Sequence, residues 1–227
     1  MIVSESNKLI VGMEEIYNSR ALGYDEHMSD VVKKFDKYYQ ILSIPFESTN
    51  EQVKILDLGC GTGAELKAIL IKCPNAQITC VDIAEEMLKL LHDKYINNRE
   101  QITLVHASYE TIDFKSRIYD YVVCAMCLHH YPYERKVRLL NKVYNSLKQY
   151  GVYVEGDFIA TPQEEKEELV KYNKLLEEHK EIEYGDYDVD APACIATEIK
   201  ILTDAGFNRV DVIYKEENQA VLVGYVD

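Results

Sequence analysis

Short apolar runs alternate with amphipathic segments along most of the chain. Five runs have the length of single strands: 53–58, 77–81, 102–105, 121–125 and 151–157. The first is apolar at nearly every position, as expected for a strand buried on both faces of a parallel sheet. Between the runs, three segments repeat apolar residues every three or four positions and are predicted helices: 64–72, 83–95 and 134–148. This alternation predicts an α/β fold.

Residues 1–50 come before the first predicted strand and have a helical pattern. A stripe spaced by three or four residues runs through Met28, Val31 or Val32, Phe35, Tyr39 and Leu42. The stripe predicts one helix, which Pro45 ends. We therefore expect an N-terminal helical cap over residues 1–50, followed by a main domain over residues 51–227.

A further helical segment interrupts the alternation after the fifth strand. Thr161, Pro162 and Glu164 combine a capping residue, a proline at the first helical position and a glutamate at the third. The helix that they start should run to about Glu181, so we expect a helical insertion at about 160–192. A last helix over 195–205 and two more strands, at 208–214 and 220–225, follow it.

A glycine-rich turn follows the first predicted strand. Gly59, Gly61 and Gly63 alternate with Cys60 and Thr62, so the turn carries little side chain and tolerates positive φ. The helix that follows begins near its end, so the backbone N–H groups of the turn lie at a helix N-terminus. A strand, a glycine turn and a helix in this order are typical of a nucleotide-cofactor site.

Two cofactors fit this turn. Gly59, Gly61 and Ala64 match the dinucleotide fingerprint, and Asp82 lies where a ribose-binding carboxylate would. Asp57, two positions before the first glycine, favours another interpretation, because a carboxylate there would repel a pyrophosphate. S-adenosylmethionine (SAM) carries an ammonium and a sulfonium and no phosphate, so it is compatible with Asp57. Asp57 could also be a solvated strand end or a turn cap.

The charge balance narrows the choice of partner. The 227 residues carry a net charge of −14, and the isoelectric point is about 4.9. These values argue against binding nucleic acid through its phosphates and against docking on an anionic membrane. They favour a small-molecule substrate.

The chain shows neither a run long enough for a transmembrane helix nor a signal-peptide core in residues 1–20, so a cytoplasmic location is expected. The six cysteines mostly lie in apolar runs and are typical of buried thiols in a reducing compartment. Cys124 and Cys127 have CxxC spacing but no second pair, so we predict no metal site.

The segment Ile-Leu-Asp-Leu-Gly-Cys-Gly-Thr-Gly, at 55–63, closely resembles motif I of class I SAM-dependent methyltransferases. The stretch Tyr-Asp-Glu-His-Met-Ser-Asp, at 24–30, resembles the ubiquinone/menaquinone-biosynthesis type. Leu-His-His-Tyr-Pro, at 128–132, resembles the motif IV region of the same family. The resemblance implies a doubly wound, mostly parallel seven-stranded sheet of the Rossmann-like methyltransferase fold. It also implies an antiparallel last strand, an N-terminal helical lid and SAM as the cofactor.

The resemblance also assigns cofactor residues. Asp82 would accept the ribose hydroxyls, although it could only cap the next helix, and Ile83 would pack on the adenine. Many relatives have Asp-Ala after the third strand, where this chain has Ser108 and Tyr109. Tyr17 and Arg20 would approach the SAM carboxylate or the substrate. Alternatively, Tyr17 only packs against its neighbours and Arg20 is a surface charge. The full predicted set is Tyr17, Arg20, Asp57, Gly59, Cys60, Gly61, Gly63, Asp82, Ile83, Met87, Ser108, Tyr109 and Cys124.

His129 and His130 are the candidate catalytic residues. They follow the fourth strand, where substrate and cofactor should meet, and an imidazole can act as a general base near neutral pH. At least one of them could instead pack under the loop. Aromatic and acidic residues alternate over 183–192, and this loop could bind a cationic substrate or only solvate a turn.

We therefore expect an enzyme that transfers the SAM methyl group to an O, N or C nucleophile of a small molecule. Such transfer can depend largely on positioning. A SAM-binding protein without transferase activity and, less favoured, a nicotinamide-dependent oxidoreductase are the alternatives. The apolar elements near both ends could support a homodimer.

Overall fold

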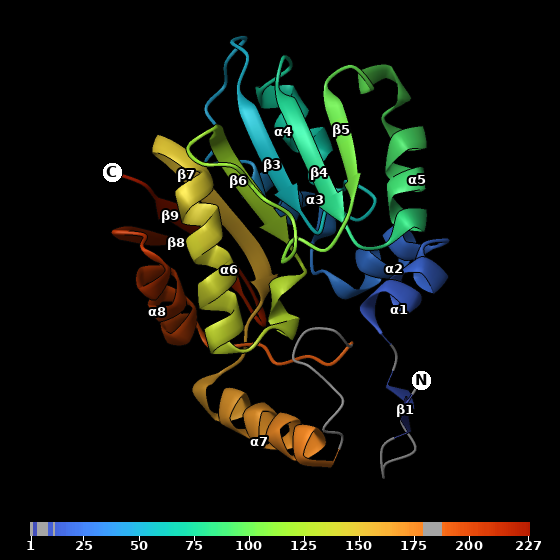
Figure 1. Ribbon diagram of the computed structural model, residues 1–227, viewed down its shortest axis with the longest axis vertical. Coiled ribbons are helices and arrows are strands. Elements are labelled where there is room, and N and C mark those ends of the chain that lie inside the picture. Colours follow the sequence, from blue (N-terminus) through green and yellow to red (C-terminus); the bar gives the residue numbers. More distant parts are fainter. Residues whose placement is uncertain (1, 4–8, 11, 179–187) are drawn as a thin grey trace.

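The computed structural model describes residues 2–3, 9–10, 12–178 and 188–227 (Figure 1). Most of the acidic loop predicted to reach the substrate, residues 183–187, lies outside the described residues, whereas Asp188 and Asp190 lie within them. Two short strands, β1 (Ile2–Val3) and β2 (Leu9–Ile10), pair antiparallel before the first helix.

One seven-stranded sheet forms the centre of the molecule, in the order β5-β4-β3-β6-β7-β9-β8. Its strands are β3 (Lys54–Leu58), β4 (Gln77–Asp82), β5 (Ile102–His106), β6 (Tyr119–Ala125), β7 (Leu147–Phe158), β8 (Arg209–Glu216) and β9 (Gln219–Tyr225). The first five are parallel, and β9 lies antiparallel between β7 and β8. The predicted mostly parallel sheet with an antiparallel last strand is confirmed.

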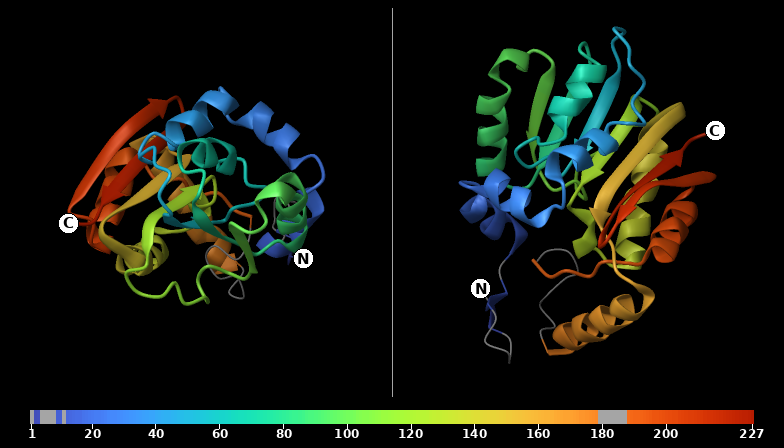
Figure 2. Two further views of the ribbon diagram at one scale, coloured as in Figure 1. Left: turned by 90° about the horizontal axis from the view of Figure 1, so that it is seen from above. Right: turned by 180° about the vertical axis from the view of Figure 1, so that it is seen from behind.

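Helices cover both faces of the sheet (Figure 2). On one face, α3 (Phe35–Leu42), α4 (Leu66–Lys72) and α5 (Glu85–Lys94) bury apolar side chains in a core with Ile55 and Val123. On the other face, α6 (Tyr133–Ser146) and α8 (Ile195–Ala205) pack on Leu56 and Val122. The strands that face both cores are therefore buried throughout, which explains their unbroken apolar runs.

The N-terminal region differs from the expectation in one respect. The single helix predicted around the stripe from Met28 to Leu42 is two helices, α2 (Tyr24–Val31) and α3, which follow α1 (Met13–Arg20). Val32 is extended and Lys34 has a φ of 53°, so the helical hydrogen bonds end between them. The apolar stripe survives the break because Met28, Val32 and Leu42 enter the same core.

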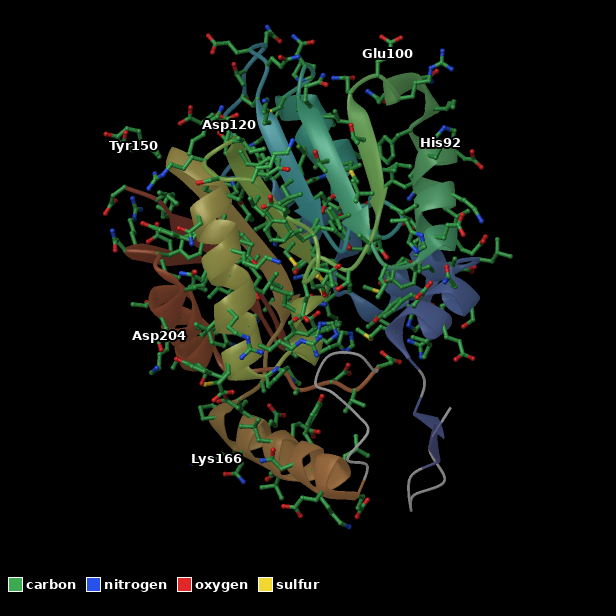
Figure 3. All side chains as sticks on the ribbon, viewed as in Figure 1. His92, Glu100, Asp120, Tyr150, Lys166 and Asp204 are labelled. Carbon is green, nitrogen blue, oxygen red and sulfur yellow. The ribbon has the colours of Figure 1, made fainter. Side chains whose placement is uncertain are left out.

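Helix α7 (Pro162–Glu178) begins as its sequence indicates. The backbone N–H of Glu164 donates to Oγ1 of Thr161, and the N–H of Thr161 donates to Oε2 of Glu164, which completes a capping box. Lys166 on this helix points outward, as do other charged side chains at the periphery (Figure 3). Within the described residues, no helix combines the length and the apolar composition needed to cross a membrane.

Candidate active site

The carboxyl ends of the parallel strands meet where the strand order reverses. The chain leaves β5 at the sheet edge and returns to β6, on the other side of β3. In open α/β sheets, ligands bind at such a switch point, outside the carboxyl ends of the strands. Two cavities lie there, and both reach the N-terminal helices.

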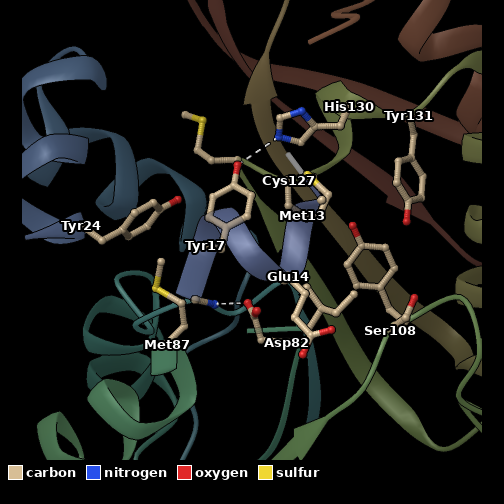
Figure 4. A pocket seen from close by; sticks show the side chains of 16 residues that line it. Met13, Glu14, Tyr17, Tyr24, Asp82, Met87, Ser108, Cys127, His130 and Tyr131 are labelled. Atoms are coloured by element: carbon tan, nitrogen blue, oxygen red, sulfur yellow. Dashed lines mark hydrogen bonds between the residues drawn. The ribbon is translucent and has the colours of Figure 1, made fainter. Parts of the chain in front are cut away.

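The first cavity, called the glycine-loop cavity below, has a volume of about 320 Å³ (Figure 4). The strand ends, α5 and the turn after β6 line it with Gly59, Gly61, Asp82, Ile83, Met87, Ser108, Tyr109, Met126, Cys127, His130 and Tyr131. The N-terminal region closes it with Gly12, Met13, Glu14, Tyr17 and Tyr24. Most of the predicted cofactor residues therefore come together in one place.

The loop after β3 approaches this cavity with backbone alone. Gly59 has a φ of 66° and Gly61 one of 47°, in the left-handed region that strains residues with side chains. A Cβ on Gly59 would lie 2.7 Å from Sγ of Cys127, which is too close for any side chain. Glycine is therefore required here both by conformation and by space.

Asp82 ties the glycine loop to the second strand. Its Oδ2 accepts the N–H of Gly61 at 2.7 Å, and its Oδ1 accepts the N–H of Ala84 at 2.8 Å. Burial raises the pKa of Asp82, and the N–H groups of Ala84 and Gly61 oppose that shift. The residue thus stabilises the start of α5 and also lines the cavity, so the two sequence-based interpretations are compatible. A carboxylate placed in this way can also accept hydrogen bonds from two ribose hydroxyls.

The rest of the lining is mostly apolar. Figure 4 shows Asp82 between Met87 on one side and Ser108 on the other. Tyr109 and Tyr131 also line the cavity, and their ring centroids lie 5.8 Å apart. The carboxylate suits the ribose of SAM, and the bare glycine backbone suits its methionine chain. The apolar walls suit its adenine. The residues present therefore fit this cofactor.

Asp57 lies beneath the glycine loop and not in the cavity wall. Its side chain is fully buried, and Glu65 is its nearest titratable neighbour. Burial, together with the adjacent Glu65 carboxyl, raises the pKa of Asp57 well above its ordinary value. A carboxyl that is buried and disposed to hold a proton would repel a pyrophosphate weakly. The identification of the cofactor therefore depends on the whole lining and not on the charge of Asp57.

Three other predicted residues also lie behind the cavity. Cys60 is buried, with its N–H directed to the carbonyl of Val81. Gly63 accepts the hydroxyl of Tyr95 at 2.7 Å through its carbonyl oxygen. Sγ of Cys124 lies 2.8 Å from Sγ of Cys127, and Cys127 is the member of that pair that reaches the cavity.

The second cavity, called the histidine cavity below, has a volume of about 620 Å³. The N-terminal helices line one side with Ile16, Tyr17, Arg20, Tyr24, His27, Met28 and Val31. The strand ends, α7 and the segment before α8 line the other side with Met126, His129, His130, Phe158, Glu168, Leu175, Asp188, Val189 and Asp190. Arg20 lies here, 3.1 Å from the carboxylate of Asp188, and not in the glycine-loop cavity.

Tyr17 and His130 lie at the junction of the two cavities. The Tyr17 hydroxyl is 3.1 Å from Nε2 of His130, and both side chains line both cavities (Figure 4). Burial raises the pKa of Tyr17, so its hydroxyl stays protonated. Burial also lowers the pKa of His130, and the neighbouring His129 lowers it further. The junction is therefore formed by two neutral groups at neutral pH.

His129 has a different environment. Its Nδ1 lies 2.6 Å from Oδ1 of Asp157, which is buried at the end of β7. Burial disfavours the imidazolium of His129, but the Asp157 carboxylate outweighs this effect and raises the pKa of His129. Burial would raise the pKa of Asp157, but His129 and Lys136 hold it below its ordinary value. Asp157 therefore stays ionised and accepts a hydrogen bond from the Nδ1–H group of His129. This hydrogen bond leaves Nε2 directed to the histidine cavity.

The two cavities also contain residues that the sequence did not single out. Tyr24, Met126 and Cys127 are the main ones in the glycine-loop cavity. Met126 has a φ of 54° at the end of β6, a strained position for a long side chain and one often found at binding sites. Cys127 belongs to the CxxC pair, and only its position beside Gly59 shows its part in the site.

Known proteins resemble this chain over most of its length. A methyltransferase domain family matches residues 55–151. A carboxy-S-adenosyl-L-methionine synthase of Nautilia profundicola is 22% identical over 93% of this chain and 99% of its own. A ubiquinone/menaquinone biosynthesis C-methyltransferase of Wigglesworthia glossinidia brevipalpis is 30% identical over 65% of this chain, and the match spans 58% of that relative.

A solved structure shares the fold. Human N-acetylserotonin methyltransferase, in complex with SAM, superimposes with a TM-score of 0.64 at 17% identity. The match covers 94% of this chain and 56% of the human protein. Together, the domain match, the relatives and the fold agree with motif I and the lining of the glycine-loop cavity. The chain contains a methyltransferase domain and is similar to SAM-dependent methyltransferases, and these findings support a methyltransferase with SAM as its cofactor.

Proposed function

We propose that the protein transfers the methyl group of SAM to an oxygen or nitrogen atom of a small molecule held in the histidine cavity. The observation that carries this proposal is the shared wall of the two cavities. Tyr17, Tyr24, Met126 and His130 line both of them, so a ligand in one cavity can contact a ligand in the other.

The residues around the junction suit a transfer between two bound molecules. SAM, when bound, supplies a methyl group on a sulfonium leaving group. The protein has to align the acceptor with that methyl and exclude water, and such positioning is the main source of catalysis in many group transfers. His129 can take a proton from an acceptor O–H or N–H, because Nε2 faces the histidine cavity while Asp157 stabilises the imidazolium.

The charges of the histidine cavity favour a neutral or cationic acceptor. Glu168, Asp188 and Asp190 contribute carboxylates, and Arg20, which pairs with Asp188, is its one arginine or lysine among the described residues. A carboxylate acceptor would meet net negative charge there. Amines and phenols are therefore the acceptor classes that we propose.

The proposal includes the predicted division of the chain. Residues 1–50 act as a cap that closes both cavities through α1 and α2. The insertion at about 160–192 walls the histidine cavity through α7 and Asp188. The six cysteines are all unpaired thiols, which supports a location in the reducing cytoplasm. A homodimer stays a prediction.

A transfer assay tests the proposal. The protein is incubated with SAM that carries a deuterated methyl group and with a panel of amines, phenols and carboxylates. Release of S-adenosylhomocysteine, together with a labelled amine or phenol, is the expected result. SAM binding without release in any reaction would favour a SAM-binding protein without transferase activity. Binding of NAD without SAM would exclude the site assignment.

A second candidate is carboxylation of SAM itself. It is favoured by the Nautilia profundicola relative, a carboxy-S-adenosyl-L-methionine synthase that this chain matches over almost its full length. The carboxylates of the histidine cavity disfavour it, because a carboxyl donor is itself anionic. Mass spectrometry of the nucleoside products separates the two candidates, since one yields S-adenosylhomocysteine and the other a sulfonium that carries an added carboxyl group.

A further inference from the structure

We propose that His129, His130 and Asp190 bind a divalent transition-metal ion in the histidine cavity. One ligand atom from each residue lies within 4.8 Å of the other two. Oδ1 of Asp190 is 3.2 Å from Nδ1 of His130 and 3.6 Å from Nε2 of His129. Two ligands at about 2.0–2.1 Å from a tetrahedral ion lie about 3.3–3.4 Å apart. The two distances to Asp190 are therefore within a few tenths of an ångström of this separation, and the two histidine nitrogens lie within 4.8 Å of each other.

His129 is oriented as metal-binding histidines usually are. Its Nδ1 hydrogen-bonds Asp157, so the lone pair of Nε2 can face the cluster once that nitrogen is deprotonated. Metal-ligating histidines almost always donate their other ring N–H to a carboxylate, a carbonyl or water. Asp157 is itself held in place, because its Oδ2 accepts the backbone N–H groups of Leu128 and His129.

His130 offers the opposite nitrogen. Its Nε2 lies 3.1 Å from the Tyr17 hydroxyl and can donate to that oxygen, which leaves a lone pair on Nδ1. Nδ1 is buried, and Oδ1 of Asp190 lies 3.2 Å from it. The two histidine rings lie 4.0 Å apart between centroids, at an angle of 43°, and each has a nitrogen close to the same Asp190 oxygen.

The ligand set indicates the class of ion. Two imidazoles and one carboxylate suit Zn²⁺, Fe²⁺ or Co²⁺, whereas Mg²⁺ and Ca²⁺ prefer oxygen ligands. Three protein ligands leave at least one coordination position open. This position would face the histidine cavity, which His129 and Asp190 also line. If the proposed function holds, an acceptor hydroxyl or amine would occupy it next to the methyl group, and Nε2 of His129, once bound to the ion, would no longer be the proton acceptor.

The competing explanation of the cluster is a protonated histidine paired with Asp190. A Co²⁺ titration of the protein without a histidine tag separates the two, because the absorption bands of Co²⁺ report its ligands. We expect one Co²⁺ per chain, visible ligand-field bands and no thiolate charge-transfer band. Zn²⁺ should displace it. Binding weaker than about 1 mM, or a thiolate band that places the ion on the cysteines, would overturn the proposal.

Variants locate the ion. Asp190→Asn and His129→Ala should each weaken Co²⁺ binding by more than about 100-fold, since removal of even an outer partner typically costs about 10–100-fold. Asp188→Asn is the matched control, because it removes the same charge from the same segment. His92→Ala controls for surface binding, since His92 lies on the outside of α5 beside Asp93 (Figure 3). Equal Co²⁺ affinity in the wild type and Asp190→Asn would show that the ion lies elsewhere.

The metal titration tests the metal site independently of the proposed function. The Asp190 side chain is 66% exposed, so Asp190→Asn should fold, and binding of S-adenosylhomocysteine verifies this. Co²⁺ binding without methyl transfer to any acceptor would leave the metal site intact and remove the proposed function. Methyl transfer by a protein that does not bind Co²⁺ would support the proposed function and overturn the metal site.

Discussion

The glycine-loop cavity and the histidine cavity share Tyr17 and His130 but are built in different ways. The glycine-loop cavity is formed mainly by residues just after strands, such as Gly59, Asp82 and Ser108, whose places follow from the sheet. The histidine cavity also has Met126, His129, His130 and Phe158 from the strand ends, but most of its lining comes from α1, α2, α7 and the segment around Asp190, which are far apart along the chain. The site for the common cofactor therefore depends mainly on the sheet, and the other site mainly on the elements added around it.

The two regions are also held by different forces. Backbone hydrogen bonds to Asp82 fix the glycine loop. The wall behind the histidine cavity depends on buried charge, because Asp157 fixes His129 and lies near the ion cluster of Lys136, Glu155 and Glu198. Substitutions in the first region should change cofactor affinity, and those in the second should change stability and acceptor binding.

The largest effect is expected from Lys136→Met. Nζ of Lys136 lies 2.6 Å from Glu155 and 2.7 Å from Glu198, all three are buried, and burial raises the pKa of Glu198 to about 7. Loss of the cation leaves two buried carboxyls together, which should lower the free energy of unfolding by about 3–5 kcal/mol. Urea denaturation measures the change.

Lys148→Met is the control for that experiment. Lys148 pairs with Asp120 at 2.7 Å, but its side chain is 42% exposed. Because exposed ion pairs contribute about 0–1 kcal/mol, this variant should stay close to the wild type. Equal losses in free energy of unfolding in the two variants would mean that the buried charge cluster does not stabilise the wall of the histidine cavity.

Gly59→Ala should come next. The new Cβ would need a positive φ and would lie 2.7 Å from Sγ of Cys127. Left-handed backbone and overpacking together should cost about 2–4 kcal/mol of folding free energy, with loss of S-adenosylhomocysteine binding by calorimetry. Gly23→Ala shares the positive φ but has no neighbouring atom within 4 Å, so it should lose only about 1–2 kcal/mol. A loss no larger than that of Gly23→Ala would show that close approach is not what Gly59 provides.

The same contrast explains what could be predicted from the sequence. The strands of the parallel sheet, the glycine loop and Asp82 follow from local patterns, because each strand end and the turn after it are contiguous. The doubly wound arrangement of those strands was expected only from the family resemblance. The break between α2 and α3 was missed because Val32 and Lys34 continue an acceptable helical pattern, and only the packing of both helices on one core places it.

The contents of the histidine cavity were less accessible to pattern analysis. His129 and His130 were identified as candidates, but the partners that orient them, Asp157 and Tyr17, are brought near only by the fold. The grouping of His129, His130 and Asp190 could not be predicted for the same reason, since Asp190 lies far along the chain from the histidine pair. Asp57 shows the reverse case, in which a motif residue is fully buried and lines neither cavity.

Asp82→Asn should show that cofactor affinity depends on the glycine-loop cavity and not on the histidine cavity. An amide cannot accept from both backbone N–H groups and ribose hydroxyls as the carboxylate can. The affinity for S-adenosylhomocysteine should fall by about 1–3 kcal/mol, the range for hydrogen bonds to charged groups. Calorimetry measures this change, and Asp188→Asn, in the histidine cavity, should leave the affinity unaltered. Unchanged affinity in Asp82→Asn would remove Asp82 from the ribose site.

Tyr17→Phe tests the junction. It removes the hydrogen bond to His130 but keeps the ring. A typical hydrogen bond contributes about 0.5–1.5 kcal/mol, so kcat/KM should fall by a few-fold to about tenfold, with S-adenosylhomocysteine affinity nearly unchanged. Tyr24→Phe is the comparison, since its ring lies beside Tyr17 with centroids 6.1 Å apart. A larger loss in cofactor affinity than in turnover would place Tyr17 in the cofactor site alone.

The smallest effect should be the pH dependence that His129 adds to stability. Burial lowers the pKa of His129, but Asp157 outweighs this effect and raises the pKa above its ordinary value of about 6.5. A raised pKa in the folded state means a stabilisation that is complete below about pH 6.5 and is lost as the pH rises through the folded-state pKa. The difference in free energy of unfolding between wild type and His129→Gln should therefore shrink as the pH rises above about 6.5.

Asp157→Asn should reverse the sign of that trend. Without the Asp157 carboxylate, burial would outweigh the weaker opposing effect of Asp190 and lower the pKa of His129, so the contribution of His129 to stability should grow as the pH rises. Urea denaturation of Asp157→Asn and of the Asp157→Asn, His129→Gln double variant gives the slope, with the exposed His92→Gln as a control that should show none. The same sign with and without Asp157 would mean that another group sets the protonation of His129, and the histidine cavity would lose the feature that distinguishes it electrostatically from the glycine-loop cavity.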